Sequence, residues 1–432
     1  MIALARFNHI DTAPVPERAL VVGVDTGRSE WSQDSSLDEL ERLVQTADGV
    51  VVARETQRLD APVPKTFVGS GKAEELAGIV RRMDIDVVVF DEELSPSQQS
   101  NLERIFGEPV KVIDRTALIL DIFGRHATTR EGRLQVQLAQ LQYLLPRLRG
   151  MWSHLMGEQT RGGIGSRFGQ GESQLEVDRR LVRDRISVLR KELKQLETRR
   201  ETQSKARWDS GVYRVALAGY TNAGKSTLLN ALTDSDVYAK DELFATLDPT
   251  TRSIDLAEGR RITLTDTVGF IQKLPTTLVE SFKSTLAEVR AADLMLKVVD
   301  AGDENWGKKL EAVDGVLRQI DASGIRSVVV FNKVDLVDPE RLESLKDANP
   351  QAVFVSAMTG AGLAGLLHRI ANEASRGDVT ITALVPYEKG MLVKMVHERC
   401  QVIREQYEDG GLLVTCKASE RMAKTLAPYV KE

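Results

Sequence analysis

The first part of the chain alternates short apolar runs with stretches of helical spacing. Residues 19–25, 49–55, 85–92 and 110–115 are short runs rich in β-branched residues, typical of buried strands. Residues 71–83 and 95–106 have helical character, and Ser95 followed by Pro96 is a helix-start signal. Strands alternating with helices predict a small α/β domain around a largely parallel sheet.

Two apolar stripes of helical spacing come next. The first consists of Leu134, Leu138, Leu141, Leu145 and Leu148, and the second of Val182, Ile186, Leu189, Leu193 and Leu196, with Leu175 one heptad earlier. Steps of three and four residues place each set along one side of a helix. The sequence RGGIGSRFGQGESQ, residues 161–174, separates them. We therefore predict an antiparallel coiled-coil hairpin with this glycine-rich loop at its tip.

Strand and helix alternation returns in the second half of the chain. Candidate strands are residues 213–219, 261–267, 293–300, 327–333 and 351–357, followed by apolar runs at 381–387 and 411–418 around a helical stretch at 389–400. The prediction is an α/β multidomain protein. It has an N-terminal α/β domain (1–125), a helical hairpin (126–208), a second α/β domain (212–375) and a small α+β C-terminal domain (376–432).

Composition and charge narrow the range of partners. The chain has 432 residues, of which 42% are hydrophobic and 28% charged, so it can bury ordinary globular cores. A net charge of −5 gives no overall attraction to nucleic acid, and a polyanion would have to meet a local basic patch. Such a patch is predicted near the loop from Arg147, Arg149, Arg161 and Arg167, together with many arginines and lysines at 179–200. Taken by itself, the set at 179–200 would indicate a solvent-exposed helix face whose basic residues pair with the acidic residues between them.

Location and cysteine chemistry follow from what the sequence lacks. The N-terminus has no secretion-signal pattern and no run of about 18 apolar residues occurs, so we expect a cytoplasmic protein without a membrane span. Cys400 and Cys416 have no metal-binding spacing or histidine-rich companion. We expect two reduced, packed thiols rather than a disulfide or a zinc site.

The sequence GYTNAGKST, residues 219–227, has the form of a phosphate-binding loop. It follows an apolar strand and opens a helix, as that loop requires. Gly219 and Gly224 let the backbone amides turn toward a β-phosphate. Lys225 would bridge the β- and γ-phosphates, and the Ser226 hydroxyl would ligate Mg²⁺.

Two further segments complete the predicted phosphate and magnesium site. Asp266 ends the apolar strand of TLTDTVG (263–269), where its carboxylate can hold Mg²⁺ through water and the Gly269 amide can sense the γ-phosphate. Within 242–252, Thr246 is the predicted second magnesium ligand, with Thr250 and Thr251 as alternatives. Phe270 stands where many GTPases carry a water-orienting Gln, so we expect slow intrinsic hydrolysis.

Base selection is predicted from the sequence NKVD at 332–335. Asp335 can accept two hydrogen bonds from guanine, which adenine cannot donate, while Asn332 and Lys333 hold the loop and cover the base. SAMTG at 356–360 follows another strand and could present amides to the guanine O6. Four elements in the required order predict GTP. By contrast, FVGSGKAEE (67–75) lacks the first Gly and the Ser or Thr of a phosphate loop, and we expect a turn and a helix start there.

Asn222 raises the possibility of a second cation. In a GxxNxGKS loop this Asn resembles the monovalent-cation ligand of potassium-activated GTPases, in which K⁺ replaces an arginine finger. The alternative is an Asn whose hydrogen bonds only stabilise the loop.

Motifs across most of the chain resemble one family. FATLDPTTR, DTVGFIQKLPTTLVESFKSTLAEVRAADL, FVGSGKAEEL, LSPSQQSNLE, DRTALILDIFGRHA and EGRLQVQLAQLQYLLPRL are similar to the HflX family of ribosome-associated GTPases, of the TRAFAC class and related to Obg-type GTPases. The similarity runs from about residue 20 to residue 375, and the end of the chain resembles a C-terminal domain that only some members carry. In the tip loop this chain departs from the family pattern by Phe168, Gln170 and one extra residue, and Gln137 replaces an expected Glu.

The resemblance implies a function and a set of contacts. Family members bind the large ribosomal subunit and bacterial ones split stalled or idle ribosomes, notably under heat stress, with the GTP form binding and hydrolysis accompanying release. The implied nucleotide contacts are Gly219, Tyr220, Thr221, Asn222, Ala223, Gly224, Lys225, Ser226, Thr227, Phe244, Ala245, Thr246, Leu247, Asp248, Asp266, Thr267, Val268, Gly269, Asn332, Lys333, Val334, Asp335, Ser356, Ala357 and Met358. Lys225, Thr246, Asp266 and Gly269 would serve catalysis, and Ser226 and Thr246 would bind Mg²⁺.

Two other functions remain open from the sequence. The protein could remodel ribosomal RNA or assist ribosome assembly, with GTP only timing the basic hairpin. It could also regulate a protein partner through the hairpin as a coiled coil. We expect a monomer.

Overall fold

The computed structural model describes residues 16–29, 31–158, 168–209, 212–233, 243–244, 246–256, 260–273 and 287–431. Within these ranges the side chains of residues 149–158, 168–175, 200–209, 287 and 421 are not described. The chain divides into two compact units. One comprises residues 1–122 with 146–175, and the other residues 123–145 with 176–432.

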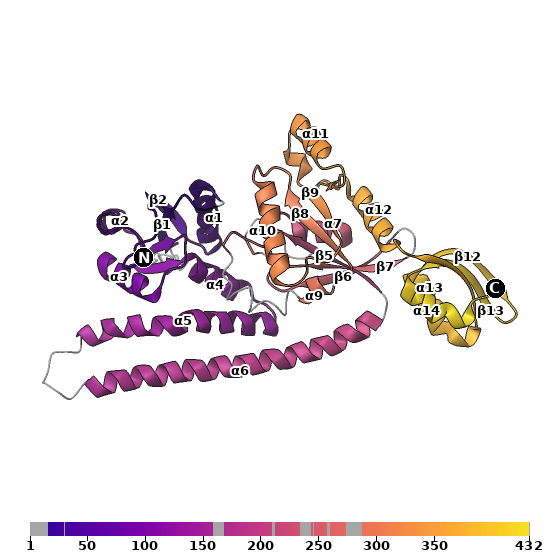
Figure 1. The fold of residues 1–432 in the computed structure, drawn as a ribbon, viewed down its shortest axis with the longest axis horizontal. Helices are drawn as coiled ribbons and strands as arrows, with labels where there is room; N and C mark the ends of the chain where they lie inside the picture. Colours follow the sequence, from indigo (N-terminus) through magenta and orange to yellow (C-terminus); the bar gives the residue numbers. More distant parts are fainter. Residues whose placement is uncertain are drawn as a thin grey trace, which may run out of the picture. The chain divides into compact units, whose positions relative to one another are not determined.

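A parallel sheet forms the core of the first unit (Figure 1). Its strands lie in the order β2-β1-β3-β4, and every neighbouring pair is parallel. The strands are β1 (Arg18–Asp25), β2 (Val50–Arg58), β3 (Val87–Phe90) and β4 (Lys111–Asp114). The intervening helices are α1 (Gln33–Thr46), α2 (Ser70–Arg82) and α3 (Pro96–Phe106). The predicted α/β domain with a parallel sheet is confirmed.

Local helix signals in this unit act as predicted. The Ser95 hydroxyl accepts from the Gln98 amide and the Gln98 side chain accepts from the Ser95 amide, a reciprocal cap that starts α3 at Pro96. The stretch at 67–75 is a turn followed by the start of α2, with Gly69 at the cap position. α4 (Arg115–His126) directly follows β4 and was not predicted.

Two long helices follow, α5 (Arg130–Glu158) and α6 (Phe168–Asp209). In the second unit, Leu138 packs with Ile186 and Leu189, and partly buried apolar residues of both predicted stripes surround them. Arg130 pairs with Glu192 and Arg185 donates to Gln137, so advancing seven residues along α5 means moving back seven along α6. The helices are therefore antiparallel, as predicted, and Gln137 has a partner in Arg185. The glycine-rich tip at 159–167 lies outside the described residues.

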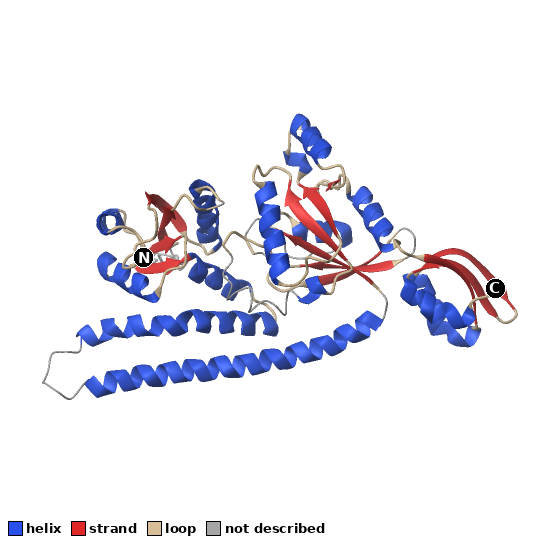
Figure 2. Cartoon of the chain, in the orientation of Figure 1, coloured by secondary structure: helices blue, strands red, loops and turns tan. Residues whose placement is uncertain are grey.

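A six-stranded sheet dominates the second unit (Figure 2). Its order is β10-β9-β8-β5-β7-β6, parallel except where β6 meets β7. The strands are β5 (Tyr213–Gly219), β6 (Thr250–Asp255), β7 (Arg261–Asp266), β8 (Leu294–Asp300), β9 (Ser327–Asn332) and β10 (Val353–Phe354). The helices are α7 (Lys225–Thr233), α9 (Ala287–Arg290), α10 (Trp306–Gln319), α11 (Pro339–Ala348) and α12 (Leu363–Ala374), with a short 3₁₀ turn η1 (Val334–Leu336).

Alternate strand residues supply the two cores of this sheet. Val328 and Val330 of β9 pack with residues of α7 and α12, whereas Val329 and Phe331 pack with α10 residues and Leu345 of α11. Helices thus cover both faces, and the carboxyl ends of the parallel strands are left for loops, which is where such sheets bind ligands.

The C-terminal sheet is small and antiparallel. Its order is β11-β13-β12, formed by β11 (Val379–Val385), β13 (Gly411–Ala418) and β12 (Gln401–Glu408). The remaining elements are α13 (Gly390–Arg399), α14 (Glu420–Leu426), η2 (Tyr387–Lys389) and η3 (Ala427–Tyr429). Cys400 and Cys416 lie buried in its core as free thiols. The strand β12 was missed because its residues are mostly exposed and polar. None of the helices in the described ranges combines the length and apolar character needed to cross a membrane.

Candidate functional site

The phosphate loop connects β5 to α7 and is bound to the segment after β7. The Thr221 amide donates to the Phe270 carbonyl at 2.7 Å, and the Phe270 amide donates to the Gly219 carbonyl at 3.1 Å. Asn222 and Gly224 adopt positive φ angles of 59° and 83°, which give the loop its curl. A side chain on Gly219 would overlap the Val298 carbonyl of β8. The loop therefore needs its glycines for two different reasons.

Lys225 lies inside this loop. Its ammonium donates to the Tyr220 carbonyl at 2.8 Å and the Gly219 carbonyl at 3.2 Å, and the side chain is buried. Burial lowers the pKa of Lys225 to about 8, although the nearby Asp266 carboxylate acts in the opposite direction. A desolvated ammonium held at the centre of a glycine-rich loop is well placed to bind phosphate oxygens.

Three predicted residues from separate segments meet beside Lys225. The Ser226 hydroxyl lies 2.7 Å from the Thr246 hydroxyl and donates to Asp266 Oδ2 at 2.6 Å. Burial raises the pKa of Asp266, against the opposing effects of Lys225 and of hydrogen bonds from Ser226 and Thr246. Among the described residues, Asp266 Oδ1 is buried without a hydrogen-bond partner.

This oxygen cluster fits Mg²⁺. Ligands at 2.0–2.1 Å on an octahedron are separated by about 2.9 Å, close to the distance between the two hydroxyls. The unpartnered oxygen of Asp266 adds the negative charge that a divalent ion or its bound water requires. Of the alternatives to Thr246, Thr251 instead contacts Thr265 in the β6–β7 pair, with 2.9 Å between hydroxyl oxygens.

The segment after Asp266 is tightly packed. The Thr267 hydroxyl donates to the Leu217 carbonyl at 2.6 Å. A side chain on Gly269 would press on Thr221, 2.8 Å from its Cγ2, and on Lys225, 3.1 Å from its ammonium. Phe270 is buried and cannot orient a water molecule. The burial of Phe270 is consistent with the expectation of slow intrinsic hydrolysis.

The predicted base site is organised by Asn332 at the end of β9. Its Nδ2 donates to the Ala223 carbonyl of the phosphate loop at 3.0 Å, and its Oδ1 accepts from the Ala357 amide at 3.0 Å. Lys333 adopts φ 64° and its ammonium pairs with Asp300 at 2.9 Å. Asp335 is exposed, as guanine binding requires. Sequence reasoning missed Asp300, which ends the neighbouring strand β8.

The side chains of two residues predicted to contact the nucleotide pack against α4 or the segment between α4 and α5. The Phe244 ring packs against Phe123 of α4, with 4.5 Å between centroids. The Asp248 carboxylate accepts hydrogen bonds from Thr128 and Thr129, just before α5. Both side chains are therefore engaged by the α4–α5 junction, and contact of these two residues with the nucleotide stays a prediction. Ala245, also predicted, lies outside the described residues.

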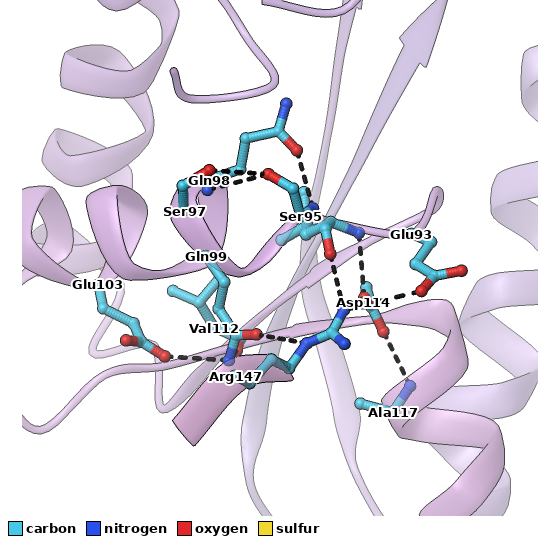
Figure 3. A network of polar contacts seen from close by, with 11 residues as sticks. Glu93, Ser95, Ser97, Gln98, Gln99, Glu103, Val112, Asp114, Ala117 and Arg147 are labelled. Atoms are coloured by element: carbon cyan, nitrogen blue, oxygen red, sulfur yellow. Dashed lines mark hydrogen bonds and ion pairs between the residues drawn. The ribbon is translucent and has the colours of Figure 1, made fainter. Parts of the chain in front are cut away.

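The prediction that Arg147 faces RNA is wrong. Its side chain is buried, and its guanidinium donates to the Leu94 carbonyl at 2.7 Å and to Asp114 at 3.2 Å, and to Gln99 at 3.1 Å (Figure 3). Asp114 also accepts from the amides of Leu94 and Ala117. Arg147 therefore fastens α5 to the N-terminal sheet. The side chain of Arg149 and the residues Arg161 and Arg167 lie outside what the structure describes.

Several family models match the chain in order. They are described as GTP-binding GTPase N-terminal (residues 34–124), GTP-binding GTPase Middle Region (126–207), 50S ribosome-binding GTPase (214–333) and HflX C-terminal domain (342–429). The last model begins before the predicted start of the C-terminal domain at residue 376.

Curated relatives match along most of their length. The GTPase HflX of Escherichia coli strain K12 is 44% identical over 397 residues, covering 91% of this chain and 92% of that one. The GTPase HflX of Magnetococcus marinus is 43% identical over 395 residues, covering 91% and 90%. A crystal structure of a GTP-binding protein from the archaeon Sulfolobus solfataricus with GDP is 23% identical, covers 83% of this chain and 99% of that one, and has a TM-score of 0.44. From its match to these relatives and family models, the chain belongs to the HflX family of GTPases.

Proposed function

We propose that the GTP-bound protein binds the large ribosomal subunit and separates stalled or idle ribosomes, and that hydrolysis accompanies release. The observation that carries this proposal is a guanine-nucleotide site on the same chain as a long antiparallel hairpin. The model described as 50S ribosome-binding GTPase matches the domain that holds this site. A factor that acts on ribosomes works in the cytoplasm, and we propose that it acts there as a monomer.

The chemistry of hydrolysis follows from the geometry of the site. The Lys225 ammonium would exchange its two carbonyl partners for phosphate oxygens and stabilise the charge that develops on them. Ser226 and Thr246 would hold Mg²⁺, which when bound neutralises the β- and γ-phosphates. The buried Phe270 leaves the attacking water without a side-chain guide from that position, so the bound partner or a further cation would supply the missing help.

Asn222 supports K⁺ as that cation. Its positive φ places it at the curl of the phosphate loop, and its side-chain amide oxygen is the kind of ligand that K⁺ accepts. We expect GTP turnover to be faster in potassium than in sodium salts at equal ionic strength. Equal rates would leave Asn222 with a role in loop stability alone.

The hairpin would supply contacts to ribosomal RNA. On the described part of α6, Arg180, Arg183, Arg185 and Arg190 are exposed, along with Lys191 and Lys194. Such residues bind phosphates without reading sequence. We also propose the tip arginines Arg161 and Arg167 as RNA contacts. For the domains, we propose boundaries at 125/126, near 210 and at 375/376.

The deciding experiment measures GTP turnover and splitting of purified ribosomes. Both should depend on the nucleotide, with splitting by the GTP form and none by the GDP form. Arg161→Ala with Arg167→Ala should leave nucleotide affinity unchanged and weaken ribosome binding by tenfold or more, since each lost phosphate contact reduces affinity and salt dependence. Arg318→Ala with Lys346→Ala, at exposed positions of the nucleotide domain, is the matched control.

The alternatives predict other results. Stimulation of GTP turnover by large subunits without splitting would favour RNA remodelling or assembly. Failure of both ribosomes and large subunits to stimulate turnover would refute the ribosomal proposals and favour a protein partner.

A further inference from the structure

Asp248 lies at the N-terminus of α5, far from it in sequence. Its Oδ2 accepts from the Thr128 amide at 3.0 Å, the Thr128 hydroxyl at 2.7 Å and the Thr129 amide at 2.8 Å, and its Oδ1 accepts from the Thr129 hydroxyl. The carboxylate thus accepts four hydrogen bonds at the start of a helix, an end where acidic side chains are favoured.

The helix has a local cap of its own. The Thr129 hydroxyl accepts from the Gly132 amide at 3.0 Å, and the Thr129 carbonyl accepts from the Arg133 amide at 3.1 Å. Since Thr129 already performs the usual capping role, α5 can start without Asp248. The contact therefore serves mainly to fix the position of the segment that carries Asp248, and less to start the helix.

That segment also carries Thr246, only two residues earlier. Two residues span at most about 7 Å, so fixing Asp248 restricts where the Thr246 hydroxyl can go. Between them Leu247 is buried, and on the other side the Phe244 ring packs on Phe123 of α4. The α4–α5 junction thus holds the segment on both sides of Thr246, in the arrangement that brings Thr246 within 2.7 Å of Ser226.

Gly132 makes room for the carboxylate. A methyl group at this position would overlap Asp248 Oδ1 and lie 3.2 Å from the Thr129 hydroxyl. In a helix, Gly is otherwise less favourable than Ala. A glycine in the first turn of α5 is explained by the space that Asp248 occupies.

We propose that Thr128, Thr129 and Gly132 form a seat for Asp248 and are positioning residues for GTP hydrolysis, because they keep Thr246 at the magnesium position. The proposal rests on the assignment of Thr246 to that position and does not depend on the ribosome. By linkage, a γ-phosphate that favours this place for Thr246 also favours an ordered start of α5, and a partner that displaces this start lowers the affinity for GTP.

Gly132→Ala gives the sharpest test because helix propensity and the seat predict opposite effects. Propensity alone would make this variant neutral or more stable. The seat predicts about tenfold weaker binding of a non-hydrolysable GTP analogue with Mg²⁺, slower hydrolysis, and GDP affinity within twofold of the native chain, since GDP lacks the phosphate that Thr246 senses. Gly78→Ala, in a helix where a methyl group meets nothing within 4 Å, is the control and should change none of these.

A second variant and a direct measurement guard against a change in folding. Thr128→Val removes the 2.7 Å hydrogen bond and should weaken analogue binding about fivefold, whereas Thr198→Val, which removes an exposed hydroxyl from α6, should not. Hydrogen exchange at the Thr128 and Thr129 amides should be slower with the analogue than with GDP, and Asp248→Asn should reduce the difference. Equal exchange in both nucleotide states, or equal loss of analogue and GDP affinity in Gly132→Ala, would overturn the proposal.

Discussion

Replacing Asn332 by Ala should disconnect the two loops of the nucleotide site. The side chain is 1% exposed and joins the Ala223 carbonyl to the Ala357 amide through two 3.0 Å hydrogen bonds. Truncation removes both bonds and leaves a buried acceptor and a buried donor without this partner. Each such group costs about 1–3 kcal/mol, and we expect a loss of about 3 kcal/mol in total.

Because the two loops enclose the nucleotide, most of this loss should appear in binding. A loss of 3 kcal/mol corresponds to about a 100-fold weaker affinity for GDP, which calorimetric titration of the purified chain can measure. Thermal unfolding without nucleotide should show a much smaller loss of stability, since the strands β5 and β9 keep their backbone hydrogen bonds to neighbouring strands. Asn349→Ala is the control, because that side chain makes one 3.0 Å bond to the Leu345 carbonyl at the end of α11. GDP affinity within threefold of the native value would refute the idea that Asn332 couples the loops.

Two other residues lead to direct predictions. Burial lowers the pKa of Lys225 to about 8, and bound phosphates would raise it again. Nucleotide affinity should therefore be constant below pH 8 and fall by up to tenfold per pH unit above it. An affinity that stays constant to pH 10 would contradict this. Arg115→Met should destabilise the chain by about 3–5 kcal/mol in urea unfolding, because it leaves the buried Asp91 and Glu39 without their shared cation, which now lies 2.6 and 2.7 Å from them. Adding Asp91→Asn and Glu39→Gln should restore much of that loss, and no recovery would argue against an electrostatic cause.

Local signals made much of the fold predictable. The Ser95–Pro96 start of α3 depends on residues three positions apart, and the leucine stripes of α5 and α6 depend on helical spacing alone. The nucleotide loops were predictable for the same reason, since each follows the strand that positions it. Where the residues that decide the structure lie close in the chain, pattern reasoning succeeded.

Long-range pairing decided the contacts that the sequence did not predict. Arg147 has the composition of a phosphate contact, and only the fold brings Asp114 to it from 33 positions away. The hydrogen bonds of Asp248 with Thr128 and Thr129 were not foreseen, because those threonines lie about 120 positions earlier. A helix-start signal in the sequence HATTREG could have identified the threonines as a cap, but nothing near them in the sequence indicates a carboxylate from so distant a part of the chain.

The burial of Arg147 has a mechanical consequence. In the proposed function the hairpin would push against a ribosome, and it would bend unless a rigid part of the protein took up the force. Arg147 directly follows Pro146, which lacks the amide for one helical hydrogen bond and so marks a weak point in α5. Its guanidinium, held by a side chain and a main-chain oxygen beside β4, braces the helix just beyond that point. Strain arriving from the tip would then be taken up by the parallel sheet of the N-terminal domain.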